Sequence, residues 1–228
     1  MGGKTAVIIV AGGSGTRMGI STPKQFLPVA GKEVVVWTIE KFAYALRNPE
    51  IVVVLPRTEI ERWGEISARH GLTGKHKVCT GGRNRYHSVK NGLECLKDSD
   101  CEYIAVHDAV RPLLSEDMIK RCVESAAKFG TAIPVVEPVD SFRLMNGGKA
   151  EVIDRSLLRA VQTPQVFRAA LLRGAYAEDY HSSFTDDASV VEKYGAHLSF
   201  CEGEHRNIKI TRHDDLVYAE AVLASGEL

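Results

Sequence analysis

The strongest chemical signal in this sequence is a glycine-rich turn with two cations directly downstream. The β-branched run from Val7 to Val10 predicts a strand buried on both faces, because no polar residue interrupts it. Because glycine has no Cβ, the turn that follows lets backbone N–H groups approach a ligand closely, and Arg17 and Lys24 add fixed positive charge nearby. Such donors at the carboxyl end of a first parallel strand favour a polyphosphate ligand. The turn consists of Ala11, Gly12, Gly13, Ser14 and Gly15.

Two common glycine motifs do not fit this stretch. A P-loop needs a lysine directly after its second glycine, and Lys24 lies too far along the chain. A dinucleotide-binding fingerprint needs a third glycine at the position of Met18. A lone G-x-G pair is equally compatible with a purely structural turn, but the string A-G-G-S-G-T-R-M-G, followed by P-K-Q, is more specific. It resembles the signature of sugar-nucleotide-type nucleotidyltransferases.

A second group of polar residues follows the predicted strand 103–106. Asp108 would lie at the carboxyl end of this strand, where open α/β sheets bind their ligands. Mg²⁺ prefers carboxylate oxygens together with substrate phosphates and water, so Asp108 is a candidate magnesium ligand, although an isolated Asp would more simply cap a turn. Arg111 places a cation in reach of the same space. A single His after an apolar strand usually belongs to the core, so we interpret His107 as structural.

The segment G-G-R-N-R-Y-H-S-V, residues 81–89, follows the third predicted strand and opens a helix. Gly82 permits backbone contact with a base, Arg85 can reach a phosphate, and Ser88 can hydrogen-bond a base edge. The alternative is an ordinary strand-to-helix loop with a charged exterior. This segment alone does not decide between the two.

Three later segments also carry polar groups. Thr163, before a proline, predicts a rigid turn with an exposed hydroxyl. Asp186 and Asp187 are adjacent at a predicted helix start, where capping is the expected role rather than paired acid–base catalysis. Residues 207–211 alternate as a short strand that places Lys209 opposite its apolar neighbours, facing either solvent or the cleft. The motifs G-x-S-x-G and H-E-x-x-H do not occur, which disfavours a hydrolase.

Strand and helix patterns alternate along the chain, and this order predicts one Rossmann-like α/β domain over residues 1–228. We expect a mostly parallel sheet with helices on both faces, and the resemblance to nucleotidyltransferases implies that this is the nucleotidyltransferase fold. The predicted strands cover residues 6–10, 51–55, 77–79, 103–106, 131–136 and 198–202. The predicted helices lie near residues 34–46, 58–70, 86–97, 115–129, 168–180, 186–194 and 213–224.

Residues 138–160 interrupt the alternation with a hairpin pattern. The turn signal Asn146-Gly147-Gly148 stands between two short alternating runs. Phe142 and Val152 are apolar residues on these runs and need a covering surface. We therefore predict a protruding β-hairpin arm that packs on a second subunit in a homodimer, with an arm folded back on its own domain as the alternative.

The overall composition bears on partners and location. Lys and Arg total 29, as do Asp and Glu, so neither nucleic acid nor an anionic membrane is indicated as a partner. The five cysteines form no C-x-x-C pair, and their odd number fits a reducing compartment. We find neither a signal peptide nor an apolar run of the ~18 residues that a membrane span needs, and expect a cytoplasmic protein.

The motifs occur in an order that resembles one family. They are A-G-G-S-G-T-R-M, P-K-Q-F, G-G-R-N-R-Y-H-S-V, H-D-A-V-R-P, T-P-Q-V-F, T-D-D-A-S and N-I-K-I-T. This set, which spans Val7 to about Leu216, is similar to the 2-C-methyl-D-erythritol 4-phosphate cytidylyltransferases of the non-mevalonate isoprenoid pathway. The resemblance implies a Mg²⁺-assisted reaction of CTP with methylerythritol phosphate, in which the substrate phosphate attacks the α-phosphorus of CTP and pyrophosphate leaves.

The same resemblance implies a role for each matching residue. Arg17 and Lys24 would neutralise charge on the α-phosphate and the leaving pyrophosphate, and Asp108 would hold Mg²⁺. Lys209 would hold the attacking phosphate beside the α-phosphate. The residues that match nucleotide-binding positions are Ala11 to Gly15, Gly82, Arg85 and Ser88. Those that match positions near the methylerythritol phosphate are Arg111, Thr163 and Thr185, together with Ser141 and Arg155 from the arm of a neighbouring subunit.

Three alternatives remain open from the sequence. The glycine-rich string is also common in the sister ribitol 5-phosphate cytidylyltransferases of teichoic acid synthesis, but H-D-A-V-R-P and D-R-S-L-L-R-A-V-Q-T-P-Q favour the isoprenoid enzymes. A protein of the same fold that binds CTP without chemistry would need no pair of cations on a leaving pyrophosphate. A hexose-1-phosphate nucleotidyltransferase that uses a different base would fail to use CTP.

Overall fold

Parallel strands form one half of a sheet with the order β10-β7-β11-β6-β1-β4-β5. The structure is a computed structural model that describes residues 3–13 and 22–226. β1 pairs in parallel with β4 on one side and β6 on the other, and β5 pairs in parallel with β4. The uninterrupted apolar runs of β1 and β4 are buried, as expected for strands covered on both faces. The strands are β1 (Thr5–Val10), β4 (Glu50–Leu55), β5 (Lys77–Thr80) and β6 (Tyr103–Asp108).

The other half of the sheet is mixed. β11 lies between β6 and β7 and runs antiparallel to both, while β12 pairs with β7 in parallel and β10 pairs with it antiparallel. Our prediction of a mostly parallel α/β sheet is confirmed, but β11 was not predicted. Its four residues follow directly on Pro164 and run into a helix, so they carry too short a pattern. The strands are β7 (Thr131–Val136), β10 (Ala160–Val161), β11 (Gln165–Arg168) and β12 (Phe200–Glu202).

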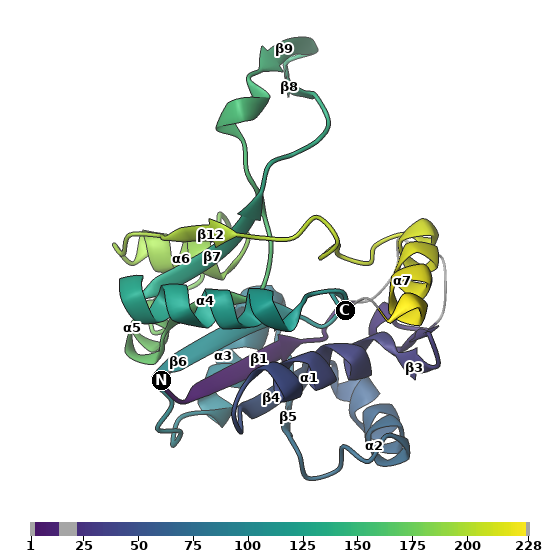
Figure 1. Cartoon of the computed structure of the whole chain (residues 1–228). Helices are drawn as coiled ribbons and strands as arrows, with labels where there is room; N and C mark the ends of the chain where they lie inside the picture. Colours follow the sequence, from purple (N-terminus) through teal and green to yellow (C-terminus); the bar gives the residue numbers. More distant parts are fainter. Residues whose placement is uncertain (1–2, 14–21, 227–228) are drawn as a thin grey trace.

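Helices cover both faces of the sheet, and the alternation of side chains along β1 divides the core between them (Figure 1). Val7 and Ile9 pack with residues of α1, α2 and α4, whereas Ile8 packs on the opposite face with residues of α3, α5 and α6. Each predicted helix is present, although α5 ends earlier than expected. The helices are α1 (Val34–Ala45), α2 (Ile60–Arg69), α3 (Arg85–Cys95), α4 (Glu116–Phe129), α5 (Ala169–Ala175), α6 (Asp187–Lys193) and α7 (His213–Ser225), and a small hairpin of β2 (Pro28–Val29) and β3 (Lys32–Glu33) precedes α1.

A second hairpin leaves the sheet between β7 and β10 and stands clear of it (Figure 1). β8 (Phe142–Asn146) and β9 (Lys149–Ile153) pair antiparallel. Gly147-Gly148 forms their turn with φ angles of 55° and 83°, which glycine adopts without strain. Phe142 is 42% exposed and Val152 is 74% exposed, so the sheet of this chain does not cover them.

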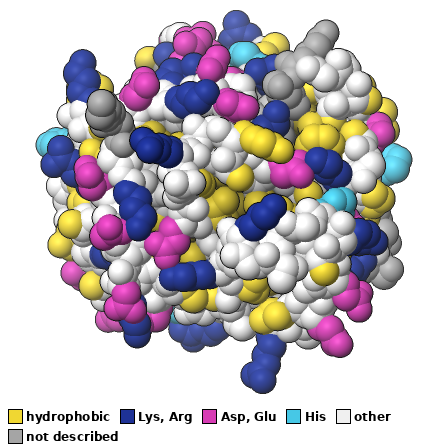
Figure 2. Space-filling model, turned by 60° about the horizontal axis from the view of Figure 1, so that its bottom comes forward, with side chains coloured by type: hydrophobic (Ala, Val, Ile, Leu, Met, Phe, Trp, Pro, Cys, Tyr) yellow, Lys and Arg dark blue, Asp and Glu magenta, His cyan; other side chains and the backbone are white. Residues whose placement is uncertain are grey.

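The surface carries mixed charge. On the face drawn in Figure 2, basic and acidic side chains are interspersed, with hydrophobic side chains between them. This distribution accords with the formal net charge of zero. No helix within the described ranges is long and apolar enough to cross a membrane.

Candidate active site

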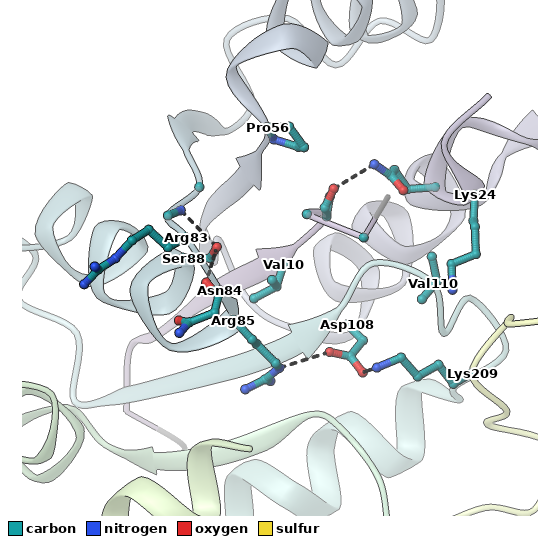
Figure 3. A pocket seen from close by; sticks show the side chains of 16 residues that line it. Val10, Lys24, Pro56, Arg83, Asn84, Arg85, Ser88, Asp108, Val110 and Lys209 are labelled. Carbon is teal, nitrogen blue, oxygen red and sulfur yellow. Dashed lines mark hydrogen bonds and ion pairs between the residues drawn. The ribbon is translucent and has the colours of Figure 1, made fainter. Parts of the chain in front are cut away.

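A cavity of about 400 Å³ lies at the carboxyl ends of the parallel strands (Figure 3). Because these ends meet at one edge of the sheet, segments far apart in the sequence surround a single space. The turn after β1, the loop between β5 and α3, and the end of β6 each supply part of its wall. The lining residues include Ala11, Gly12, Gly13, Lys24, Gln25, Gly81, Gly82, Arg85, Ser88, Asp108 and Lys209.

The turn after β1 leaves the strand in a fixed direction. The Ala11 N–H donates to the Val54 carbonyl at 2.8 Å, and the Ala11 carbonyl accepts from Gln25 Nε2 at 2.7 Å. Gly12 and Gly13 are exposed at the cavity, so their backbones face it without an intervening side chain. The remaining predicted residues of this stretch lie outside the described residues: Ser14, Gly15 and Arg17.

Asp108 lies at the centre of a charge cluster at the end of β6 (Figure 3). Its Oδ2 is 2.9 Å from Lys209 Nζ and 3.6 Å from Arg111 Nε, and its Oδ1 is 3.5 Å from Arg85 Nε. Burial alone would raise the pKa of the Asp108 carboxyl, but Arg85, Lys209 and Arg111 together hold this pKa well below its usual range. The carboxylate is therefore ionised at neutral pH.

The segment that carries Lys209 is not a strand, so our prediction for residues 207–211 was wrong. Its backbone is tied to the end of the sheet at one point, where the Ile210 N–H donates to the Val110 carbonyl at 2.9 Å. The Ile210 carbonyl accepts from Lys24 Nζ at 3.0 Å. The Lys209 side chain points at Asp108, which settles the orientation that the alternating pattern left open. The segment thus brings Lys24 and Lys209 to the same side of the cavity.

Asn207 holds the start of this segment, a role that the sequence pattern did not predict. Its side chain is fully buried and donates from Nδ2 to the Thr163 carbonyl at 2.9 Å. Its own carbonyl accepts from Arg111 Nη1 at 2.8 Å. The signal available in the sequence was a polar amide next to apolar Ile208, because an amide that is buried with an apolar neighbour makes hydrogen bonds.

The hydroxyl of Thr163 is buried rather than exposed, contrary to our prediction. The antiparallel pairing of β11 with β6 places Thr163 beside the end of β6, where it is 5% exposed. Its Oγ1 accepts from the Asp108 N–H at 3.1 Å and lies 3.0 Å from His107 Nδ1. His107 Nε2 contacts the Arg111 carbonyl at 3.2 Å, and burial lowers the pKa of His107 to about 3. His107 is thus a neutral, hydrogen-bonded core residue, as we interpreted it.

Replacing Thr163 with valine should lower the free energy of unfolding by about 1–3 kcal/mol, because the buried Asp108 N–H loses its acceptor. Urea denaturation of the wild type and the variant measures this difference. Thr185→Val is the matched control, since Thr185 is exposed and should tolerate the change within ~0.5 kcal/mol. Equal midpoints for the wild type and Thr163→Val would show that the hydroxyl does not support the end of β6.

The loop between β5 and α3 is held by its own side chains. Ser88 Oγ donates to the Asn84 carbonyl at 2.9 Å and accepts from the Gly82 N–H at 3.1 Å. A Cβ on Gly82 would come within 2.3 Å of His87 Cβ, so only glycine fits there. The predicted Ser88 therefore supports the loop backbone within this chain.

Arg85 spans two carboxylates at the wall of the cavity. Its Nη2 donates to Asp187 Oδ2 at 2.6 Å, and its Nε faces Asp108 at 3.5 Å. We predicted a capping role for both Asp186 and Asp187. Asp186 does cap α6, accepting from the Ser189 N–H, but Asp187 is fully buried in this ion pair instead.

A smaller depression of about 280 Å³ adjoins the cavity and shares three residues with it: Arg85, Asp108 and Lys209. Arg111, Thr163 and Thr185 also line this depression, so the structure brings together the residues that we predicted near the second substrate. Ser141 and Arg155 are not among them. They line a separate hollow at the base of the β8–β9 hairpin, where Arg155 Nη1 donates to the Val139 carbonyl.

Comparison with known proteins bears on the activity of this site. The family model described as 2-C-methyl-D-erythritol 4-phosphate cytidylyltransferase matches residues 5–225. The chain belongs to this family. It is 43% identical over 220 residues to the 2-C-methyl-D-erythritol 4-phosphate cytidylyltransferase of Bacteroides thetaiotaomicron, covering 96% of this chain and 100% of the relative. The corresponding protein of Geobacillus kaustophilus is 39% identical over 221 residues, covering 96% of each chain.

Solved structures of cytidylyltransferases in this family show the same architecture. The crystal structure of the Thermus thermophilus protein superposes with a TM-score of 0.75 at 30% identity, covering 97% of this chain and 99% of that one. The Francisella tularensis structure gives a TM-score of 0.80 at 28% identity, covering 96% and 99%. The chain is therefore a CTP-dependent cytidylyltransferase that converts 2-C-methyl-D-erythritol 4-phosphate to its CDP derivative with release of pyrophosphate. The family match favours this acceptor over ribitol 5-phosphate.

Proposed function

We propose that this cytidylyltransferase works by in-line attack of the methylerythritol phosphate on the α-phosphorus of CTP. The observation that carries the proposal is the position of Asp108 and its cations in the wall that the two depressions share. A nucleotide in the cavity, the larger of the two depressions, and a phosphate in the smaller depression would meet at this wall. Catalysis then consists of positioning and charge stabilisation, with no covalent bond to the protein.

The larger depression suits the nucleotide. The exposed backbone of Gly12 and Gly13 supplies N–H groups for phosphates, in the manner of other glycine-rich turns. Across the cavity, the loop with Gly82 offers backbone groups to a base, and Ser88 keeps that loop in shape. From the family resemblance, we further propose that Ala11, Ser14 and Gly15 contact the nucleotide.

Magnesium fits the donor set at Asp108. Within residues 3–13 and 22–226 no group of three or more His, Cys, Asp and Glu side chains is arranged to hold a metal ion. One ionised carboxylate suits Mg²⁺, because this ion commonly takes its other ligands from substrate phosphates and water. When bound, Mg²⁺ would neutralise charge on the nucleotide phosphates. We therefore assign Asp108 as the residue that would hold it.

The cations divide between the two substrates. We assign Lys24, with Arg17, to the charge that develops on the α-phosphate and the leaving pyrophosphate. Lys209 reaches the wall shared by both depressions and would hold the attacking phosphate beside the α-phosphate. Arg111, Thr163 and Thr185 line the smaller depression and would bind methylerythritol phosphate.

The β8–β9 hairpin supports a homodimer. Its exposed apolar residues need a covering surface, and Ser141 and Arg155 at its base lie apart from the cavity of their own chain. We propose that they enter the site of a second subunit, as the family resemblance implies. The free thiols of all five cysteines fit the reducing cytoplasm, where we place the reaction.

The dimer proposal predicts complementation between two inactive variants. Lys24→Ala and Arg155→Ala should each be inactive alone, yet their 1:1 mixture should recover about a quarter of the wild-type rate, because each mixed dimer regains one intact site. Pyrophosphate release after co-refolding or co-expression measures the recovery. Arg143→Ala, an exposed change on the same hairpin, is the control and should keep full activity. Mixing that recovers nothing would show that Arg155 serves its own subunit or none.

Pyrophosphate release with CTP and Mg²⁺ tests the proposed function as a whole. Methylerythritol 4-phosphate and ribitol 5-phosphate are offered in separate reactions. We expect turnover with the first acceptor alone. Turnover with ribitol phosphate alone would overturn the assignment of the acceptor, and silence with both, while CTP still binds, would overturn the catalytic role of the site.

A further inference from the structure

Two buried residues behind the active site have no place in the mechanism so far. Asp187 is fully buried at the start of α6, and Tyr176, directly after α5, is 2% exposed. Asp187 Oδ1 accepts from the Tyr176 hydroxyl at 2.6 Å, and its Oδ2 accepts from Arg85 Nη2 at 2.6 Å. A buried ion pair is weak evidence for stability, because desolvation offsets most of the attraction. The pair therefore calls for another explanation.

The contacts of Arg85 are unequal. The guanidinium is 2.6 Å from Asp187 but 3.5 Å from Asp108 Oδ1. On Asp108, Oδ2 lies 2.9 Å from Lys209, so Oδ1 is the less tightly engaged oxygen. An arginine freed from Asp187 would be able to move closer to Asp108, the carboxylate within reach, and form a short ion pair with its Oδ1. Such a pair would cover Oδ1.

We propose that Asp187, held by Tyr176, is a positioning residue that draws Arg85 away from Asp108 and so keeps Asp108 Oδ1 available to a divalent cation. The proposal rests on the proposed magnesium role of Asp108. Asp187 touches neither substrate nor metal in this account and acts through Arg85 alone.

Aromatic packing and a hydrogen bond support the position of Tyr176. The ring of Tyr176 stacks on Tyr86, with ring centroids 4.8 Å apart and an angle of 18° between the planes. Tyr86 follows Arg85 directly in α3, and its hydroxyl donates to the Glu178 carbonyl at 2.5 Å. Tyr86 therefore links the ring of Tyr176, whose hydroxyl bonds Asp187, to α3, the helix that carries Arg85. Outer-shell partners of this kind typically change metal affinity ~10–100-fold when they are lost.

Mn²⁺ affinity of the enzyme–CTP complex tests the proposal without turnover. The probe is Mn²⁺ itself, followed by the loss of its free-ion electron paramagnetic resonance signal, with no acceptor present. Asp187→Asn should weaken Mn²⁺ binding about 10-fold. Tyr176→Phe should weaken it in the same direction but less, and it carries the test if Asp187→Asn fails to fold. Asp179→Asn, an exposed change in the same region, is the control and should leave the affinity unchanged.

A double variant separates positioning from mere structural support. If Arg85 captures Asp108 when Asp187 is lost, then adding Arg85→Gln to Asp187→Asn should restore Mn²⁺ affinity to that of Arg85→Gln alone. Unchanged affinity in folded Asp187→Asn, or a double variant as weak as Asp187→Asn, would overturn the proposal. Asp108→Asn distinguishes the two levels: if this variant binds Mn²⁺ as well as the wild type, the proposed metal site itself fails.

Discussion

Replacing Asp108 with asparagine is expected to lower kcat for pyrophosphate release about 10²–10³-fold, by analogy with the loss of one oxyanion-hole donor. Asparagine keeps the size of the side chain but removes the anion shared by Arg85, Lys209 and Arg111. It also removes the proposed protein ligand of Mg²⁺. We therefore expect the variant to require more Mg²⁺ for half-maximal rate. Initial rates over a series of Mg²⁺ concentrations measure both effects.

The control for this prediction is a carboxylate away from the site. Asp98 is exposed after α3, and Asp98→Asn should leave both the rate and the Mg²⁺ dependence unchanged. In Asp108→Asn three cations lose a buried partner, which can destabilise the protein. Thermal melts therefore check that this variant is folded. A folded Asp108→Asn with wild-type kcat and Mg²⁺ dependence would contradict the role that we assign to this carboxylate.

Replacing Lys24 with methionine is expected to have an effect of similar size, about 10²–10³-fold on kcat. Lys24 is 8% exposed, and its ammonium group donates to the Ile210 carbonyl at the cavity wall. Methionine keeps the apolar stem and removes the charge. Since the charge on the leaving pyrophosphate grows in the transition state, kcat and kcat/KM should fall together.

Steady-state kinetics with varied CTP distinguishes this role from simple binding. Lys75→Met is the matched control, because Lys75 is exposed and lies outside the cavity. It should behave like the wild type. A Lys24→Met variant with raised KM for CTP and normal kcat would mean that Lys24 binds the ground state and the transition state equally.

The sequence predicts those parts of the site that depend on local pattern. The buried run before Ala11 and the apolar run before Asp108 both predict parallel strands. Parallel strands place their carboxyl ends at one edge of the sheet. This reasoning suffices to bring the glycine-rich turn and Asp108 to the same cavity. The order of elements likewise predicts the helices on both faces of the sheet.

The rest of the site depends on contacts between distant residues. Thr163 and Asp108 are 55 positions apart in the sequence and meet because β11 runs antiparallel beside β6. The four residues of β11 carry no pattern that predicts this pairing. Arg85 and Asp187 are 102 positions apart, and adjacent acidic residues at a helix start give no hint that one is a cap and the other a buried partner. The alternating pattern around Lys209 predicts a strand, but an irregular segment can carry the same alternation. Here the segment is irregular, and a hydrogen bond from Asn207 holds its start.

The central claim, direct in-line transfer without a covalent enzyme intermediate, is tested most directly by the stereochemical course at the α-phosphorus. The substrate is one diastereomer of CTP with sulfur in place of a non-bridging α-oxygen, reacted with methylerythritol phosphate. A single in-line displacement predicts inversion of configuration in the CDP product. Retention would require two displacements and therefore a nucleophile on the protein, which would contradict the account.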